Sequence, residues 1–184
     1  MSTLVVSIPQ HRNTSIPKHL PGNLLHVPPI KTHLDEVDVQ LLALLQADGR
    51  ITNADLAKHV QLSPPSVLQR VRVLEKAGLI RGYHALLDAD RLGLRITAFA
   101  GVSLALHQDQ AIERFRRSIQ DIEEVLECYH VSGEFDFLLK IVVADIRAYE
   151  RLIREKLSKI KGLGQIRTSF VLSATKHTTE LPLR

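Results

Sequence analysis

The 184-residue sequence contains a single cysteine, Cys128. An intramolecular disulfide is therefore impossible, which excludes the small secreted folds that depend on disulfide bridges. This cysteine content suits a reducing compartment, and we expect the protein to act in the cytoplasm.

Long hydrophobic runs are also absent. No stretch approaches the roughly 20 apolar residues that a membrane-spanning helix requires, so no membrane partner is expected. The first residues, MSTLVVSIPQHRN, contain a short apolar patch, but no basic residue precedes it and no small-residue cleavage site follows it. This pattern does not match a secretory signal peptide.

A strong excess of one charge is missing as well. The formal net charge is +4 at pH 7. Residues 1–34 supply most of it, because they carry no acidic residue and three basic ones: Arg12, Lys18 and Lys31. Residues 35–95 hold equal numbers of basic and acidic side chains. DNA binding must therefore be argued from local clustering of side chains and not from net charge.

Residues 1–33 are rich in proline. Five of the chain's eight prolines fall here: Pro9, Pro17, Pro21, Pro28 and Pro29. No helical or strand periodicity persists between them. We expect a disordered N-terminal tail over residues 1–33. The alternatives are a basic arm that contacts DNA and a translation start placed too far upstream.

Residues 34–78 change abruptly to helical patterning. Apolar residues recur with helical spacing over residues 37–45, and Gly49 follows them as a typical helix-ending residue. A second helix is expected to begin at Thr52, a favoured N-cap residue. A third is expected to begin at Ser63-Pro64, because serine caps helices and proline is favoured at the first helical position.

The second and third helices have the spacing of a helix-turn-helix motif. If Val67, Val71 and Leu74 point inward, the opposite side of the third helix is available to DNA. Glutamine can pair with adenine, arginine with guanine or phosphate, and the last basic residues suit phosphate contacts. The predicted DNA-binding residues are Ser63, Pro65, Ser66, Gln69, Arg70, Arg72 and Lys76. From this pattern alone, a three-helix bundle with a polar surface remains an equal alternative.

A second domain follows. Residues 79–88 are expected to form a β-ribbon that completes a winged helix-turn-helix domain over residues 34–88, and residues 89–95 a connector. The apolar period then changes to two. Strands are expected over residues 96–106, 125–132, 135–144 and 166–174, and helices over 109–121 and 149–160. The fold class is thus α+β, with a ferredoxin-like βαββαβ domain over residues 96–184.

The predicted sheet has two different faces. Right-handed crossovers place both helices on one face. Alternate strand positions supply a second apolar set for the other face, namely Phe99, Ala105, Val131, Leu138, Val142 and Val171. An apolar sheet face of this kind must be covered, which favours self-association.

Three separated segments carry a family resemblance. The first is LDEVDVQLLALLQADGRIT at residues 34–52, the second LSPPSVLQRVRVLEKAGLIRGYHALLD at residues 62–88, and the third ECYHVSGEFDFLLK at residues 127–140. In this order they resemble the Lrp/AsnC family, the leucine-responsive or feast/famine regulators. The resemblance extends over residues 34–183.

This resemblance implies a winged helix-turn-helix head that binds double-stranded promoter DNA, and a ferredoxin-like domain that senses an amino acid or related metabolite. It also implies homodimers formed through the sheets, assembled into octamers or larger discs. We therefore expect a sequence-specific transcriptional regulator whose activity and assembly respond to such an effector. The alternative is a ligand-independent, nucleoid-type architectural protein. Arg70 and Arg72 on an exposed helix argue against a stand-alone sensor.

The turn at residues 132–136 is the candidate effector site. Its glycine lets backbone amides approach an α-carboxylate closely, and either acid of the turn offers a partner for the α-ammonium. In the family that the chain resembles, the corresponding turn lines an effector site between dimers. The predicted effector-binding residues are His130, Ser132, Gly133, Glu134, Phe135 and Asp136. Without the resemblance, a hairpin turn with solvated acids is the simpler interpretation.

No catalytic, cofactor or metal site is expected. Cys128 and His130 share one face of a predicted strand, but a buried thiol on a strand is usually inert. No pair of histidine or cysteine residues has metal-site spacing, and Gly162-Leu-Gly164 lacks the rest of a dinucleotide fingerprint. The sequence therefore predicts that the protein is not an enzyme.

Overall fold

The computed structural model describes residues 34–105 and 109–183. The described residues form two compact units, one extending to Gly82 and the other running from Tyr83 to Leu181. The tail expected over residues 1–33 lies outside the described residues.

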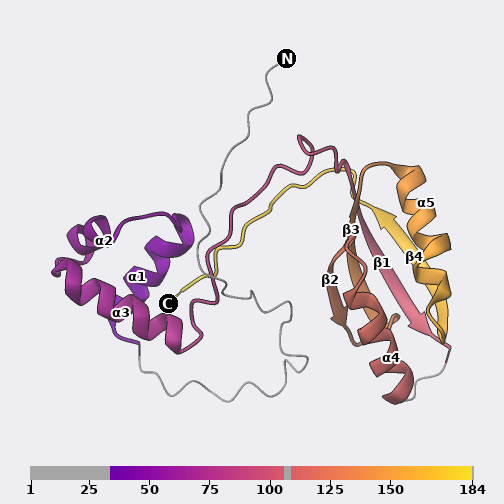
Figure 1. The fold of residues 1–184 in the computed structure, drawn as a ribbon, viewed down its shortest axis with the longest axis horizontal. Helices are drawn as coiled ribbons and strands as arrows, with labels where there is room; N and C mark the ends of the chain where they lie inside the picture. Colours follow the sequence, from indigo (N-terminus) through magenta and orange to yellow (C-terminus); the bar gives the residue numbers. More distant parts are fainter. Residues whose placement is uncertain (1–33, 106–108, 184) are drawn as a thin grey trace, which may run out of the picture. The chain divides into compact units, whose positions relative to one another are not determined.

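The first unit consists of three helices, α1 (Glu36–Ala47), α2 (Asn53–Val60) and α3 (Pro64–Lys76) (Figure 1). The Asp35 carboxylate caps α1 by accepting from the Asp38 amide, and the Asp38 carboxylate accepts from the Asp35 amide in return. Thr52 and Ser63 cap α2 and α3, as their sequence positions predicted.

The inward faces of these helices meet in one hydrophobic core. Val67, Val71 and Leu74 of α3 are buried, as their spacing predicted. The full set of buried core residues is Leu41, Leu56, Ala57, Val60, Val67, Val71 and Leu74. Burial of one such valine or leucine contributes about 1.5–3 kcal/mol, so this core fixes how α3 sits on α1 and α2.

The β-ribbon expected over residues 79–88 is not formed, because this stretch contains no strand. Leu86 and Leu87 are 78% and 74% exposed. An extended segment becomes a strand only when a second strand aligns with its hydrogen-bonding groups. Residues 89–94 form a turn, in which the Leu94 amide donates to the Ala89 carbonyl at 2.8 Å.

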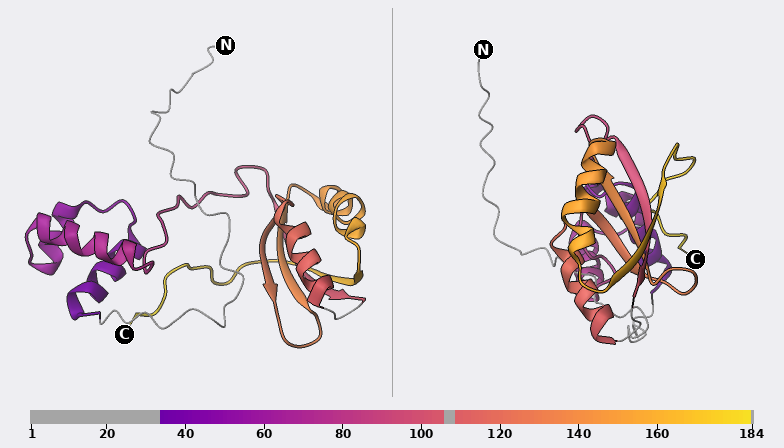
Figure 2. Two further views of the ribbon diagram at one scale, coloured as in Figure 1. Left: turned by 60° about the horizontal axis from the view of Figure 1, so that its bottom comes forward. Right: turned by 90° about the vertical axis from the view of Figure 1, so that its right-hand side faces the viewer.

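The second unit is a four-stranded antiparallel sheet with two helices on one face (Figures 1 and 2). Its elements are β1 (Ile96–Leu104), α4 (Asp109–Gln120), β2 (Val125–His130), β3 (Phe137–Val143), α5 (Ile146–Glu155), the 3-10 helix η1 (Leu157–Lys159) and β4 (Leu163–Phe170). The strand order is β2-β3-β1-β4. The predicted ferredoxin-like arrangement is therefore confirmed.

Several element boundaries differ from the sequence prediction, most of all in the last helix and the last strand. The helix expected over residues 149–160 ends at Glu155 and is followed by η1. The last strand was expected over residues 166–174 but spans residues 163–170. Its pairing with β1 ends where Phe170 lies opposite Ala98, so the length of β4 is set by its partner and not by its own alternation.

Strand register sorts the sheet residues into two faces. On β1, Ala98, Ala100 and Val102 are fully buried in the core shared with the helices. Phe99 points the opposite way and is 39% exposed. We call that side the open face, and its central residues are Phe99 and Gly101 of β1, Leu138 and Lys140 of β3, and Arg167 of β4.

The turn between α2 and α3 contains a strained residue. Gln61 has φ 53° and ψ 41°, a left-handed conformation that costs a residue with a Cβ about 1–2 kcal/mol. We expect Gln61→Gly to raise the free energy of unfolding by about 0.5–1 kcal/mol, since glycine removes this strain but gains entropy in the unfolded chain. Urea denaturation measures the difference.

A matched control is Gln40→Gly, at an exposed position inside α1. Glycine there should lower the free energy of unfolding by about 1 kcal/mol. A loss of stability in both variants would contradict the strain at Gln61.

Candidate nucleic-acid interface and effector site

The polar side of α3 forms the candidate DNA interface. Because the apolar stripe of α3 points inward, the helix exposes Pro65, Ser66, Gln69, Arg72 and Lys76. The Ser63 side chain lies at the start of this surface, with its hydroxyl 2.8 Å from that of Ser66. The first two residues of α3 are prolines without amide protons, and the Ser66 amide donates to the Ser63 hydroxyl, so contacts to bases or phosphates on this surface must come from side chains.

A hollow of about 370 Å³ lies on this surface and is lined by Asp38, Ser66, Gln69, Arg70 and Val73. Val73 is 51% exposed, and sequence reasoning did not select it. The available signal was its position, because it is an apolar residue outside the inward stripe of α3. An exposed aliphatic side chain beside an amide suits contact with the methyl group of thymine.

Arg70 has partners inside the protein. Its Nη1 donates to Asp35 Oδ2 and to Asp38 Oδ1, both at 2.8 Å. The pKa of Asp35 lies below its ordinary value of 3.8, first because the Asp38 amide donates to it and second because Arg70 does. The Arg70 side chain is 36% exposed and ties α3 to the first turn of α1.

The turn at residues 132–136 is held against β1. The Asp136 carboxylate accepts from the Leu104 amide at 2.7 Å, and the Asp136 amide donates to the Val102 carbonyl at 3.0 Å. The Val131 amide donates to the Asp136 carbonyl at 3.0 Å, which closes the turn. Asp136 therefore fixes the position of the turn on the sheet.

The Phe135 ring lies over Gly101 on the open face. A Cβ at Gly101 would approach the ring atoms to 2.6 Å, so only glycine admits the ring in this position. Arg167 lies over the ring, with its guanidinium carbon 6.0 Å from the ring centre, and forms an ion pair with Glu134. Sequence reasoning missed Gly101 and Arg167, because only strand register brings them to the turn.

His130 is separated from this group. It stacks on the buried Phe137, with ring centres 4.9 Å apart, and its Nδ1 lies 3.4 Å from Arg116 of α4. These neighbours place it on the helix-covered side of the sheet, whereas Phe135 lies on the open face. The structure thus brings Glu134, Phe135 and Arg167 together but does not bring His130 to them.

Cys128 lacks the surroundings of a nucleophile. Burial raises the pKa of its thiol to about 11, although Arg116 acts in the opposite direction. A thiol with this pKa stays protonated at neutral pH. No group of three or more potential metal ligands occurs within residues 34–105 and 109–183.

Comparison with known proteins agrees with this division. A family model described as winged helix-turn-helix DNA-binding matches residues 34–81, and one described as Lrp/AsnC ligand binding domain matches residues 97–181. The leucine-responsive regulatory protein of Escherichia coli is 40% identical over 151 residues, which is 82% of this chain and 92% of that protein. The chain belongs to the Lrp/AsnC family.

Solved structures give the same result. A Neisseria meningitidis transcriptional regulator in complex with L-Met is similar with a TM-score of 0.78 and 39% identity, covering 82% of this chain and 97% of that one. Escherichia coli AsnC is similar with a TM-score of 0.76 and 25% identity, covering 82% and 100%. This family member is a DNA-binding transcriptional regulator with a ligand-binding domain, and its relatives are regulators and not enzymes.

Among the described helices, none is long and apolar enough to cross a membrane.

The Arg70 ion pairs give a testable expectation for stability. Arg70→Gln removes both pairs between α3 and α1, so we expect a lower melting temperature. Arg72→Gln is the control, because Arg72 is exposed and forms no ion pair with any described residue. Differential scanning calorimetry checks the difference, and equal melting temperatures would contradict it.

The effect should depend on pH with a defined sign. Because folding lowers the pKa of Asp35, its contribution is present above the ordinary pKa of 3.8 and is lost as the pH falls through the lowered value. The difference in melting temperature between wild type and Arg70→Gln should therefore shrink in acid.

Proposed function

We propose that the protein is a cytoplasmic, sequence-specific transcriptional regulator whose DNA binding and assembly respond to an amino acid. The observation that carries the proposal is the polar side of α3, which exposes glutamine and basic residues opposite a buried apolar stripe. The proposed functional division is a DNA-binding domain over residues 34–88, a connector over residues 89–95 and an effector domain over residues 96–184.

The residues of α3 have different proposed roles. Gln69 contacts a base edge, together with Ser66 and the exposed Val73, because these side chains line one hollow. Arg72 and Lys76 lie further along the helix and hold phosphates. Arg70 positions α3 through its two carboxylate partners, so a base contact by Arg70 requires both ion pairs to open.

This assignment predicts two kinds of variant. Gln69→Ala should reduce the preference for an operator over random DNA, with a loss of about 1–3 kcal/mol in discrimination. Arg72→Gln and Lys76→Gln should each weaken binding to every sequence and lower the slope of log K against log salt by about 1. Fluorescence anisotropy over a salt series measures both effects.

Lys159→Gln in η1 is the matched control and should leave the salt slope unchanged. Unchanged slopes for Arg72→Gln and Lys76→Gln would exclude α3 as the phosphate-binding helix. An unchanged preference in Gln69→Ala would exclude Gln69 as the base contact.

The proposed effector site is the turn at residues 132–136 on the open face. The Glu134–Arg167 ion pair and the Asp136 carboxylate supply charges of both signs, which an amino-acid zwitterion requires. Gly133 has φ 129° and open space where a Cβ would stand, so a ligand can approach its backbone. The complex of the Neisseria meningitidis relative with L-Met supports an amino acid as the effector.

Self-association is part of the proposal. Phe99 and Val171 are 39% and 37% exposed on the sheet side that the helices leave uncovered. We propose that the open faces of two copies pack together in a homodimer, and that dimers assemble into octamers or larger discs. The turn then lies at a boundary between subunits, where an effector can change assembly.

The variant Asp136→Asn removes the negative charge of the turn but keeps an oxygen for its hydrogen bond to β1. An asparagine oxygen still accepts from the Leu104 amide, whereas the negative charge is lost. We expect the variant to fold and bind DNA but to bind the effector at least about tenfold more weakly, because a charge-assisted hydrogen bond is lost. A thermal-shift screen first identifies the amino acid that raises the melting temperature of the wild type most. Calorimetry then measures the affinity of the wild type and of the variant for that amino acid.

Asp121→Asn, at an exposed position after α4, is the control and should bind the effector normally. Sedimentation of the wild type with and without effector tests assembly. A monomer at micromolar concentration would contradict the proposed self-association. If no amino acid altered the assembly or the DNA affinity, the protein would be better described as an architectural DNA-binding protein.

A further inference from the structure

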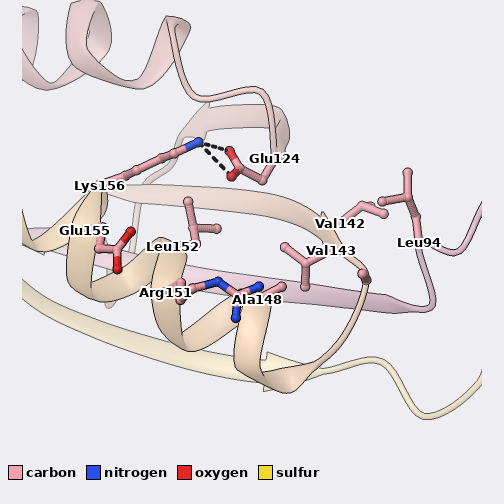
Figure 3. Close-up of a pocket in the computed structure, with 10 residues that line it drawn as sticks. Leu94, Glu124, Val142, Val143, Ala148, Arg151, Leu152, Glu155 and Lys156 are labelled. Atoms are coloured by element: carbon pink, nitrogen blue, oxygen red, sulfur yellow. Dashed lines mark hydrogen bonds and ion pairs between the residues drawn. The ribbon is translucent and has the colours of Figure 1, made fainter.

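A second pocket, of about 230 Å³, lies between α5, the end of β3 and the segment before β2 (Figure 3). It is separate from the effector turn, because the turn precedes β3 and the pocket lies where β3 ends. A strand of seven residues spans roughly 20 Å. Pockets for drug-sized ligands measure about 300–1,000 Å³, so this one suits a molecule of a few carbons.

The floor of the pocket is apolar. Val143 of β3 and Leu152 of α5 are 3% and 2% exposed. Ala148 of α5 and Leu94, which precedes β1, complete the apolar wall. A floor of branched aliphatic side chains favours an aliphatic group over a polar one.

Four charged side chains line the rim, two acidic (Glu124 and Glu155) and two basic (Arg151 and Lys156), and they differ in whether they have a partner. Lys156 Nζ donates to both carboxylate oxygens of Glu124 at 2.7 Å, so these two charges cancel. Glu155 accepts from Arg154 Nη2 at 3.1 Å. The Arg151 side chain also lines the pocket and forms no hydrogen bond or ion pair with another residue in the described part of the chain. Among the charged side chains that line the pocket, Arg151 is therefore the one without an ion-pair partner in the described part of the chain, and it lies beside an apolar floor.

We infer that this pocket binds a short, branched aliphatic monocarboxylate, with its carboxylate on Arg151 and its alkyl group on the floor. The ligand is expected to carry a negative charge and no positive charge. An amino acid of the same skeleton also brings an ammonium group, and both nearby carboxylates, Glu124 and Glu155, are already ion-paired. The pocket thus selects a carboxylic acid that lacks the amino group, unlike the effector turn.

The test uses the full chain and 3-methylbutanoate as the probe, measured by calorimetry. The wild type should bind saturably at concentrations up to about 10 mM. Arg151→Gln should bind at least about tenfold more weakly, because the charge-assisted hydrogen bonds are lost. Arg147→Gln is the matched control, since it removes an exposed arginine of α5 that does not line the pocket, and it should bind like the wild type.

Two further variants make the result decisive. Ala148→Leu fills the pocket without a change in charge and should also abolish probe binding. Asp136→Asn, at the effector turn, should keep it, which separates this inference from the proposed amino-acid site. The inference is overturned if the wild type does not bind the probe, if Arg151→Gln binds it normally, or if L-leucine displaces it with equal affinity.

Discussion

The pairing of β1 with β3 and β4 places Ala98, Ala100 and Val102 under the two helices and turns Phe99 and Gly101 the other way. A four-stranded sheet with both helices on one side has one face that the helices bury and one face that they leave uncovered. No helix packs on the uncovered face. The turn at residues 132–136 lies over part of it, with the Phe135 ring on Gly101. The Phe135 ring then occupies the space that a Cβ at Gly101 would fill. The proposed effector site and the proposed dimer surface therefore both depend on the same strand register.

The DNA-binding unit depends on a different kind of contact. Its core is small, and the orientation of α3 is fixed both by buried aliphatic side chains and by Arg70 on the carboxylates of α1. Those carboxylates also cap α1, so one cluster stabilises the helix start and the helix packing together. Arg70, which the sequence analysis assigned to DNA, is thereby engaged in ion pairs that hold α3 against α1.

Local features of the sequence predicted most of the fold. Ser63-Pro64 and Thr52 marked helix starts, and the alternation from Ile96 onward marked the sheet, because capping and pleating act between near neighbours. The prediction of a β-ribbon at residues 79–88 was wrong for the opposite reason, since a strand needs a partner strand and local sequence pattern does not specify one. The same limit hid Arg167 and Gly101 from the sequence analysis, as both reach Phe135 only through the register of β1 and β4.

The two proposed ligand sites differ in the ion pairs that they already contain. The Glu134–Arg167 pair is exposed on both sides, and an exposed pair contributes at most about 1 kcal/mol, so a ligand can open it cheaply. A zwitterion that separates the two side chains gives each a new partner, and no charge is left alone. A simple carboxylate there would satisfy Arg167 and leave Glu134 unpaired. The proposed α5 pocket favours the opposite kind of ligand. Among the charged side chains that line it, only that of Arg151 has no ion-pair partner in the described residues, so a monocarboxylate would complete the pairing. On these two proposals, the ion pairs already present in each site would distinguish an amino acid from the carboxylic acid of the same skeleton.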